Sequence, residues 1–496
     1  MITALLVLSL LGALIAAMST DPKAELAKRS AVAVSLVATL ASGAMYFGYN
    51  TVQGGFQFVE KAAWLPSLGI SYHVGLDGIS LPFVFLTALL TLVSVLASWQ
   101  QQDKSFFSLL LVMMGALIGV FSTLDLILYF VAWEIVLIPM FFIIGVWGYE
   151  NRRYAAIKFL LYSLTGSVFM LVAILALAFQ VSGSAGIGLS FDYETLRAHA
   201  GVLATVPQFA AWTFWGFLVA YLIKLPVFPL HTWLPHAHTQ APTAGSILLA
   251  GVLLKMGGYS IIRFNLGLFP AQMHQFQGVL AFLAVVGIIY GAYVAMAQKD
   301  LKRLVAYSSV SHMGFVLLGI ASLTSMGIHG AVYQMVAHGI ITGLMFMMVG
   351  FLANRTHTRE ISAMHGMYDA MPVLGGLMWM AFLGGLGLPG LAGFIGEFTS
   401  LLGAVQSSGT VWFGYAALIG IMITAGFILW TIQRVLLGRS SSEGLRLPDL
   451  SAIEIAAAAP LAALAIILGL FPPALTPWID SAVQPLLTAV KALASR

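Results

Sequence analysis

The chain has 496 residues, of which 60% are hydrophobic and 8% are charged. Soluble proteins carry about 25% charged residues, so this composition excludes a water-soluble enzyme. The chain has no cysteine, which excludes disulfides, cysteine-ligated iron–sulfur clusters and c-type haem attachment within it. Its net charge is +4, and the basic residues lie in loops between apolar stretches, so they indicate membrane topology and not nucleic-acid binding.

Apolar stretches long enough to cross a bilayer, about 20 residues each, recur along the chain. They predict about fourteen transmembrane helices, near residues 2–18, 31–49, 78–98, 105–122, 125–147, 155–180, 209–234, 242–263, 275–297, 303–322, 327–350, 371–406, 411–434 and 453–470. The first stretch follows no basic segment, which favours a retained helix over a cleaved signal peptide. The loops near 50–77 and 181–208 are too short for a soluble domain.

The last segment, from about Thr476 to Ser495, is predicted to be an interfacial helix on the outer surface. Its apolar residues recur at roughly helical spacing, and Asp480 and Lys491 lie between them. These apolar residues are Trp478, Val483, Leu486, Leu487, Val490 and Leu493.

Positive charge is distributed unevenly between the two sides of the predicted bundle. One set of alternate loops holds Lys23, Lys28, Arg29, Lys104, Arg152, Arg153, Lys158, Lys299, Lys302, Arg303, Arg355, Arg359, Arg434, Arg439 and Arg446. The opposite side holds Lys61, Arg197, Arg263, Lys491 and Arg496. Because basic loops stay in the cytoplasm, this bias predicts that both termini lie on the outer side of the membrane.

Six ionisable residues stand out deep inside the predicted helices, where a charge costs about 2.5 to 3.5 kcal/mol at mid-bilayer. They are Glu134, Lys224, Lys255, His312, His338 and Glu397. A desolvated lysine loses its proton more readily and a nearby carboxylate restores it, while histidine titrates near neutral pH, so the set suits proton transfer. A structural alternative stays open, in which a buried lysine–glutamate pair holds helices together or Lys224 extends to the interface.

Two of the predicted helices contain prolines that should interrupt them. Pro226 and Pro229 deprive the carbonyls of Leu222 and Leu225 of helical partners on either side of Lys224. Pro389, in the stretch GGLGLPGLAG, does the same for Gly385 a few residues before Glu397. Broken helices mark translocation sites in transporters, although a plain kink is the alternative.

The positions of the two breaks predict an internal repeat. Helices 4–8 and helices 9–13 form two blocks of five, and each block has its broken helix in fourth place, as helix 7 and helix 12. An odd number of helices inverts the second block relative to the first.

Three histidines follow the first break: His231, His236 and His238. They have neither cysteine nor carboxylate beside them, so we interpret them as a polar helix end and predict no metal site.

Four stretches resemble the antiporter-like membrane subunits of respiratory complex I, the NADH:quinone oxidoreductase. They read FVAWEIVLIPMFFIIGVWG, KLPVFPLHTWLPHAHTQAPTAGSILLAGVLLKMGGYSIIRF, QKDLKRLVAYSSVSHMGFVLLG and GLPGLAGFIGEF, and the resemblance covers roughly residues 70–435. It implies an all-α polytopic fold with about fourteen helices and two inverted repeats. The implied domains are residues 1–104 (helices 1–3), 105–263 (first repeat), 275–434 (second repeat) and 435–496 (helix 14 and the interfacial helix).

The resemblance also implies roles for the buried residues in pumping protons. It makes Glu134 and Lys224 a functional pair, Lys255 a central relay, and His312 and His338 members of a central hydrophilic axis. The remaining residue is Glu397, at a position that holds lysine in the sister chains L and N and glutamate in the third antiporter-like chain, which implies that third chain.

The partners implied by the resemblance are the other membrane subunits of the complex, with chains L and N on either side, and membrane lipids. NADH, FMN, iron–sulfur clusters and quinone would be bound elsewhere in the complex, so this chain is expected to carry no cofactor. The implied location is the bacterial inner membrane. Three alternatives stay open: a subunit of a multi-subunit Na+/H+ antiporter, a subunit of a membrane-bound hydrogenase-type or formate-oxidising ion pump, and a passive assembly scaffold.

Overall fold

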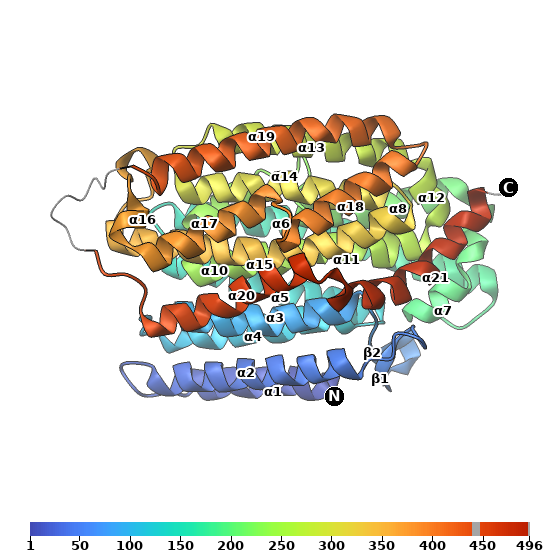
Figure 1. Cartoon of the computed structure of the whole chain (residues 1–496). Coiled ribbons are helices and arrows are strands. Elements are labelled where there is room, and N and C mark those ends of the chain that lie inside the picture. The colour runs from blue at the N-terminus through green and yellow to red at the C-terminus, as the bar shows by residue number, and fades with distance from the viewer. Residues whose placement is uncertain (439–446, 495–496) are drawn as a thin grey trace.

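The computed structural model describes residues 1–438 and 447–494, with side chains up to residue 488. Arg439, Arg446 and Arg496 of the charge analysis lie outside the described residues, and so do the side chains of Val490, Lys491 and Leu493. Long helices run side by side through the molecule (Figure 1). The fold is therefore mostly helical and polytopic, as the apolar stretches predict.

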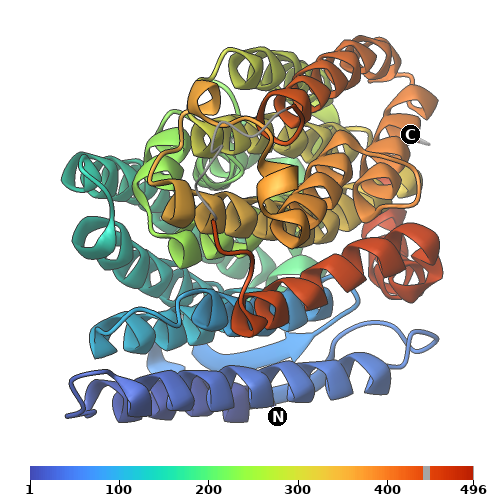
Figure 2. The ribbon, with the colours of Figure 1, turned by 60° about the vertical axis from the view of Figure 1, so that its left-hand side comes forward.

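Eleven helices of the described residues are long and apolar enough to cross a membrane. They are α2 (Glu25–Gly48), α3 (Ser80–Ala97), α4 (Lys104–Ser122), α5 (Leu126–Trp147), α6 (Arg152–Ala185), the continuous stretch Thr243–Leu266, α13 (Gln277–Met296), α14 (Leu301–Ala321), α15 (Ser325–Thr356), α19 (Val411–Val435) and α20 (Ala452–Leu470). Two shorter apolar helices are α1 (Ile2–Ala17) and α17 (Pro372–Leu386). Figure 2 shows α1 and α2 along one edge of the bundle and α13 and α19 along the opposite edge.

Both helices with internal prolines are interrupted. The first half-helix, α8 (Pro207–Lys224), ends at its lysine, and the chain resumes as α9 (Trp233–Gln240). In the second, α17 stops before Pro389 and α18 (Ala392–Gln406) follows. The carbonyl of Leu222 has no helical partner at Pro226, and the amide of Val227, one residue further on, donates to it instead at 3.0 Å.

The stretch Thr243–Leu266 is one helix with two widened turns. It consists of α10 (Thr243–Leu248), the π-helical η3 (Leu249–Leu253), α11 (Leu254–Ser260) and the π-helical η4 (Ile261–Leu266). Short π-helical turns inside α-helices are frequent at functional sites. Lys255 lies directly after the first of them.

The segment near 50–77 contains a β-hairpin, so its prediction as a loop is wrong. Strand β1 (Gln57–Leu65) pairs antiparallel with β2 (Ile70–Leu76), and Lys61 lies opposite His73. The short turn η1 (Pro66–Leu68) joins them and ends at Gly69, whose φ of 70° suits glycine. The sequence did not reveal the strands because apolar and polar residues do not alternate regularly in β1.

The hairpin lies at the end of the bundle toward which the start of α1 and the C-terminal helix α21 (Thr476–Ala494) also lie (Figure 1). Several short elements complete the chain: α7 (Tyr193–Ala198), η2 (Ala200–Thr205), α12 (Pro270–Gln275), η5 (Ile361–Ala363), α16 (Met367–Ala370) and η6 (Pro472–Ala474). The apolar face of α21 is buried against the protein, with Val483 and Leu487 fully covered. Trp478 stacks on Tyr46 of α2 with ring centroids 4.4 Å apart.

Candidate functional site

Helix α15 forms the centre of the candidate site, and its membrane-spanning part is entirely buried. Two glycines let neighbouring backbones approach it closely. A Cβ on Gly339 would lie 2.7 Å from the carbonyl oxygen of Gly251 in η3, and a Cβ on Gly396 of α18 would lie 2.5 Å from the Cα of Gln334. Small residues of this kind allow tight helix contacts in membranes. They bring Lys255 and Glu397, on two neighbouring helices, close to α15.

Lys255 and His338 form the first contact of the site. The lysine Nζ lies 2.7 Å from the imidazole Nδ1, and it also donates to the carbonyl of Ala250 in the preceding π-helical turn. Thr342, one turn further along α15, places its hydroxyl 3.0 Å from the same Nδ1. An imidazole nitrogen can accept a hydrogen bond from an ammonium group or donate one to a neutral amine, so this contact can hold one proton between the two groups. Both side chains are buried.

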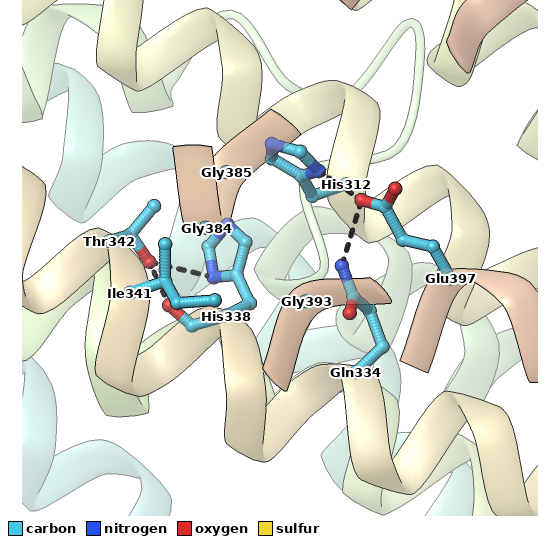
Figure 3. A pocket seen from close by; sticks show the side chains of 9 residues that line it. All are labelled: His312, Gln334, His338, Ile341, Thr342, Gly384, Gly385, Gly393 and Glu397. Carbon is cyan, nitrogen blue, oxygen red and sulfur yellow. Dashed lines mark hydrogen bonds and ion pairs between the residues drawn. The ribbon is translucent and has the colours of Figure 1, made fainter. Parts of the chain in front are cut away.

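His312 and Glu397 form the second contact (Figure 3). The imidazole Nδ1–H of His312, on α14, donates to the carboxylate Oε1 of Glu397 at 2.6 Å. The amide of Gln334 donates to the same oxygen at 3.1 Å. Glu397 is 6% exposed, so its charge is shielded from solvent and held by two donors. These two hydrogen bonds fix the position of the carboxyl group between α14 and α15.

The two contacts meet at a small cavity between the histidines. The rings of His312 and His338 lie with centroids 5.5 Å apart, and the cavity between α14, α15, α17 and α18 has a volume of about 10 Å³ for the centre of a water molecule. That is about the minimum space for one water. Within the described part of the chain, the Nε2 atoms of both histidines have no hydrogen-bond partner. A single water molecule there would connect the lysine–histidine contact to the histidine–glutamate contact.

Lys224 lies at the broken helix, in a pocket of aromatic rings. Its Nζ donates to the hydroxyl of Ser163 on α6 at 3.1 Å and lies 5.0 Å from the ring centre of Phe159. The residue is 1% exposed. A hydroxyl and the faces of aromatic rings are the partners of this buried cation.

Glu134 is not joined to Lys224 in this structure. Its side chain is partly exposed on α5, and its Oε1 atom has no hydrogen-bond partner among the described residues. Among the described residues, Glu134 and Lys224 form no ion pair. The ring of Trp133, the residue before Glu134 on α5, lies 5.6 Å from the Nζ of Lys224. The structure therefore brings together Lys255, His338, His312 and Glu397, and leaves the predicted first pair apart.

Two polar residues of the site were not predicted from the sequence. Gln334 lies four residues before His338 in α15 and Thr342 four residues after it, on the same face; Gln334 bonds to Glu397 and Thr342 bonds to His338. Their spacing of four residues on either side of a buried histidine is the signal that could have identified them, since such residues share one face of a helix.

A third unpredicted residue is His238, which the sequence suggested only as part of a polar helix end. It is fully buried, and neither ring nitrogen has a hydrogen-bond partner among the described residues. Its ring stacks on that of Phe346 at 4.5 Å. The structure thus places a buried imidazole next to α15, one helical turn beyond Thr342.

Arg263 and Lys302, like Lys28, were assigned to loops and are buried instead. Arg263 lies in η4 and pairs with Asp77 at 2.6 Å, in contact with the faces of Phe56 and Tyr259. Lys302 lies in the first turn of α14 and is 2% exposed. The sequence assigned both to loops because they stand near the ends of apolar stretches, where chain order does not distinguish a loop charge from a buried one.

The interrupted helices and the buried row of lysine, histidine and glutamate define the class of antiporter-like membrane subunits. The sequence profile of the family described as "NADH:quinone oxidoreductase/Mrp antiporter, TM" matches residues 123–424. The chain belongs to this family. It is 40% identical over 474 residues to the NADH-quinone oxidoreductase subunit M of Rhodobacter capsulatus, covering 93% of this chain and 90% of that protein. It is 39% identical to an NAD(P)H-quinone oxidoreductase chain 4 of Nostoc, covering 97% and 90%.

Solved structures agree with this membership. A chain of respiratory complex I from Thermus thermophilus superposes with a TM-score of 0.89 and 32% identity, covering 99% of this chain and all of that one. A chain of the Mrp complex from Dietzia superposes with a TM-score of 0.84 at 19% identity, covering 100% and 99%, and shares the fold. The resemblance drawn from the sequence is confirmed, including the preference for the third antiporter-like chain, since the relatives from Rhodobacter capsulatus and several Rickettsia species are all named subunit M.

Proposed function

We propose that this chain translocates protons as a membrane subunit of an NADH:quinone oxidoreductase. The observation that carries the proposal is the row of four buried groups in which Lys255 contacts His338 at 2.7 Å and His312 contacts Glu397 at 2.6 Å. Each contact can hold a proton on either partner, and the cavity between them has room for one water. Protons can pass along such a row without any larger ion entering it.

The same geometry argues against the Na+/H+ antiporter alternative. Hard cations take about six or more oxygen ligands, whereas the cavity between the two histidines has room for about one water and presents three oxygen-bearing side chains, those of Gln334, Thr342 and Glu397, beside the two imidazoles. Relatives named NADH-quinone oxidoreductase are about 40% identical to this chain, against 19% for the chain of the Mrp complex. Both observations support a proton-moving subunit of complex I.

In this proposal the two halves of the row have different tasks. Glu134 and Lys224 receive the coupling signal, because their pairing can change: one is partly exposed and the other is held by a hydroxyl. Lys255 and His338 relay the proton, and His312 and Glu397 deliver it. The exposed apolar side chains of Val131, Ile135 and Ile138 beside the partly exposed Glu134 support a neighbouring subunit on that face of α5, and we assign chains L and N as the flanking partners.

The wider assignments follow from the same proposal. Residues 105–263 and 275–434 are the two inverted repeats, residues 1–104 add helices 1–3, and residues 435–496 add helix 14 and the terminal helix. The end of the bundle without the hairpin carries most basic loops, so it faces the cytoplasm of a bacterial inner membrane and both termini face outward. NADH, FMN, the iron–sulfur clusters and quinone would be held by partner subunits, and lipids surround the helices.

The test is NADH-driven proton uptake by inverted membrane vesicles that carry Lys224→Ala or Glu134→Ala. Assembly of the whole complex is checked on a native gel, and Lys23→Ala, an exposed lysine in the first loop, is the control. Assembled complex that no longer pumps with either variant supports the proposal. Full pumping in both variants would show that the buried charges only hold helices together.

A further inference from the structure

Lys302 is a buried lysine that the proposed path does not yet use. It occupies the second position of α14, where the positive end of the helix dipole disfavours a cation. The residue is 2% exposed, and the ion pairs of the described residues give it no carboxylate partner. Its Nζ donates to the carbonyl of Ala241 and lies 5.2 Å from the ring centre of Tyr149.

A polar vestibule lies directly outside this lysine, at the end of the bundle away from the hairpin. The vestibule is a cavity of about 1100 Å³ lined by Tyr149, Glu150, Lys299, Asp300, Arg359 and Glu360, among others. Tyr149 forms part of the wall and also contacts Lys302, so one side chain connects the open cavity to the buried amine. The carboxylates of the vestibule can collect protons from the adjoining aqueous phase.

The structural explanation for Lys302 is that it caps the broken helix. The last carbonyls of α9 are each bonded: Thr239 by Arg359 at 2.7 Å, Gln240 by the amide of Tyr149 at 2.9 Å, and Ala241 by Lys302. Cations at this end of a helix are favourable. However, Arg359 provides the same kind of bond from a partly exposed position with Asp300 as counter-ion. Capping alone therefore does not require a lysine, which differs from arginine in being able to release its proton.

Three polar side chains, those of His238, Thr342 and His338, follow Lys302 toward the centre of the bundle, with the ring of Phe346 packed on the first of them. Ala241 stands three residues beyond His238, so one helical turn separates the lysine contact from the unpartnered imidazole. His238 stacks on Phe346, and Phe346, Thr342 and His338 follow one another at four-residue spacing on one face of α15. The hydroxyl of Thr342 contacts the Nδ1 of His338.

We propose that Lys302 is a proton-transfer residue that takes protons from the vestibule and passes them through His238 and Thr342 to His338. This inference rests on the proposed function and identifies its uptake branch on the inner side. Each step moves one proton between a lysine amine, an imidazole, a hydroxyl and water. It breaks one N–H or O–H bond and forms another, and no other covalent bond changes.

The deciding experiment compares Lys302→Arg with wild type in the assembled complex. Arginine keeps the positive charge and a donor for the carbonyl of Ala241, but it does not release its proton. We expect normal assembly on a native gel and unchanged thermal stability, with NADH-driven proton uptake reduced at least about tenfold. The matched control is Lys28→Arg, a buried lysine over the ring of Trp99 that lies outside the path.

Normal proton uptake by Lys302→Arg would overturn the inference and leave Lys302 as a cap of α9. If arginine prevents assembly, Lys302→Met takes its place: assembled complex that does not pump supports the inference, and full pumping overturns it. Lys224→Ala, measured in the same vesicles, separates the two proposals. Loss of pumping with Lys224→Ala and full pumping with Lys302→Arg would refute only the uptake branch, whereas full pumping with Lys224→Ala would refute the proposed function itself.

Discussion

The carboxylate of Glu397, in the buried row, and that of Glu134, near Lys224, are held in opposite ways. Glu397 is 6% exposed and accepts hydrogen bonds from His312 and Gln334, whereas Glu134 is partly exposed and its Oε1 atom has no partner among the described residues. A carboxylate with two fixed donors resists movement, while one without a partner can turn toward or away from a nearby cation. We infer that Glu134 can change its partner near Lys224, whereas Glu397 is held in place by His312. We call the region around Glu134 and Lys224 the adjustable end of the path and the region around His312 and Glu397 its fixed end.

The largest difference is expected when each carboxylate is removed. Glu397→Ala leaves the buried N–H groups of His312 and Gln334 without an acceptor, and breaking a buried charge pair costs about 3 to 5 kcal/mol. Glu134→Ala removes a partly exposed group with no such donors and should change stability by less than about 0.5 kcal/mol. Thermal unfolding of the purified complex in detergent, followed by native gel, measures both. Equal destabilisation by the two variants would remove the distinction between a fixed and an adjustable end.

The next largest effect, on proton uptake, is expected at Lys255 and His338, which lie between the adjustable and the fixed end. Lys255→Met keeps the volume of the side chain but removes the proton that Lys255 and His338 hold in common. We expect assembled complex whose NADH-driven proton uptake is reduced about a hundredfold, the lower end of what a positioned acid–base group contributes. Inverted vesicles give the measurement, and Lys23→Met is the exposed control. Uptake within a factor of two of wild type would mean that the two ends work without this relay.

These expectations show which parts of the site the sequence could supply. The ionisable residues were identifiable because charge is expensive inside a bilayer, and the interruptions followed from Pro226, Pro229 and Pro389, since proline lacks an amide hydrogen. Which groups touch depends on helix contacts set by small residues such as Gly339 and Gly396, and chain order alone contains no such distances.

Errors in the sequence analysis have equally specific causes. Arg263 and Lys302 stand at the ends of apolar stretches, where hydropathy cannot separate a loop from a buried turn, so both were placed in loops although both are buried. The β-hairpin was not predicted because polar and apolar residues do not alternate regularly in β1, and most side chains of this strand are exposed. The functional pair of Glu134 and Lys224 stays a prediction, because the spacing of residues along the chain does not fix the rotation of α5 that sets the distance between the two side chains.

A third prediction sharpens the meaning of the fixed end. Glu397→Gln keeps an oxygen that can accept the hydrogen bond of His312 and so preserves most of the packing, but it removes the negative charge and the ability to take up a proton. We expect assembly close to wild type and proton uptake reduced about tenfold. Vesicle uptake measured with both Glu397→Gln and Glu397→Ala separates the two roles. Normal uptake with the glutamine variant would show that Glu397 stabilises the helices and carries no proton.

The smallest effect is expected outside the membrane, where Asp192 holds the hairpin through a bond from His73 at 2.5 Å and from Lys61 at 2.9 Å. Burial favours the neutral acid, but the hydrogen bonds of His73, Lys61 and Thr195 outweigh it and hold the pKa of Asp192 below its ordinary value. A carboxyl whose pKa falls on folding contributes stability above its unfolded pKa, about 3.9, and loses it as the pH drops through the folded value.

Asp192→Asn should therefore lower stability by about 1 kcal/mol at pH 7 and leave proton uptake intact. The difference from wild type should shrink as the pH falls below about 4, because Asp192 then takes up a proton in the unfolded chain while it stays ionised in the folded protein, which favours unfolding of the wild type. Thermal unfolding between pH 3 and pH 7 measures it. A difference that grows toward acid pH would mean that Asp192 is held as the neutral acid. Its carboxyl group would then lack a fixed charge partner, as that of Glu134 does.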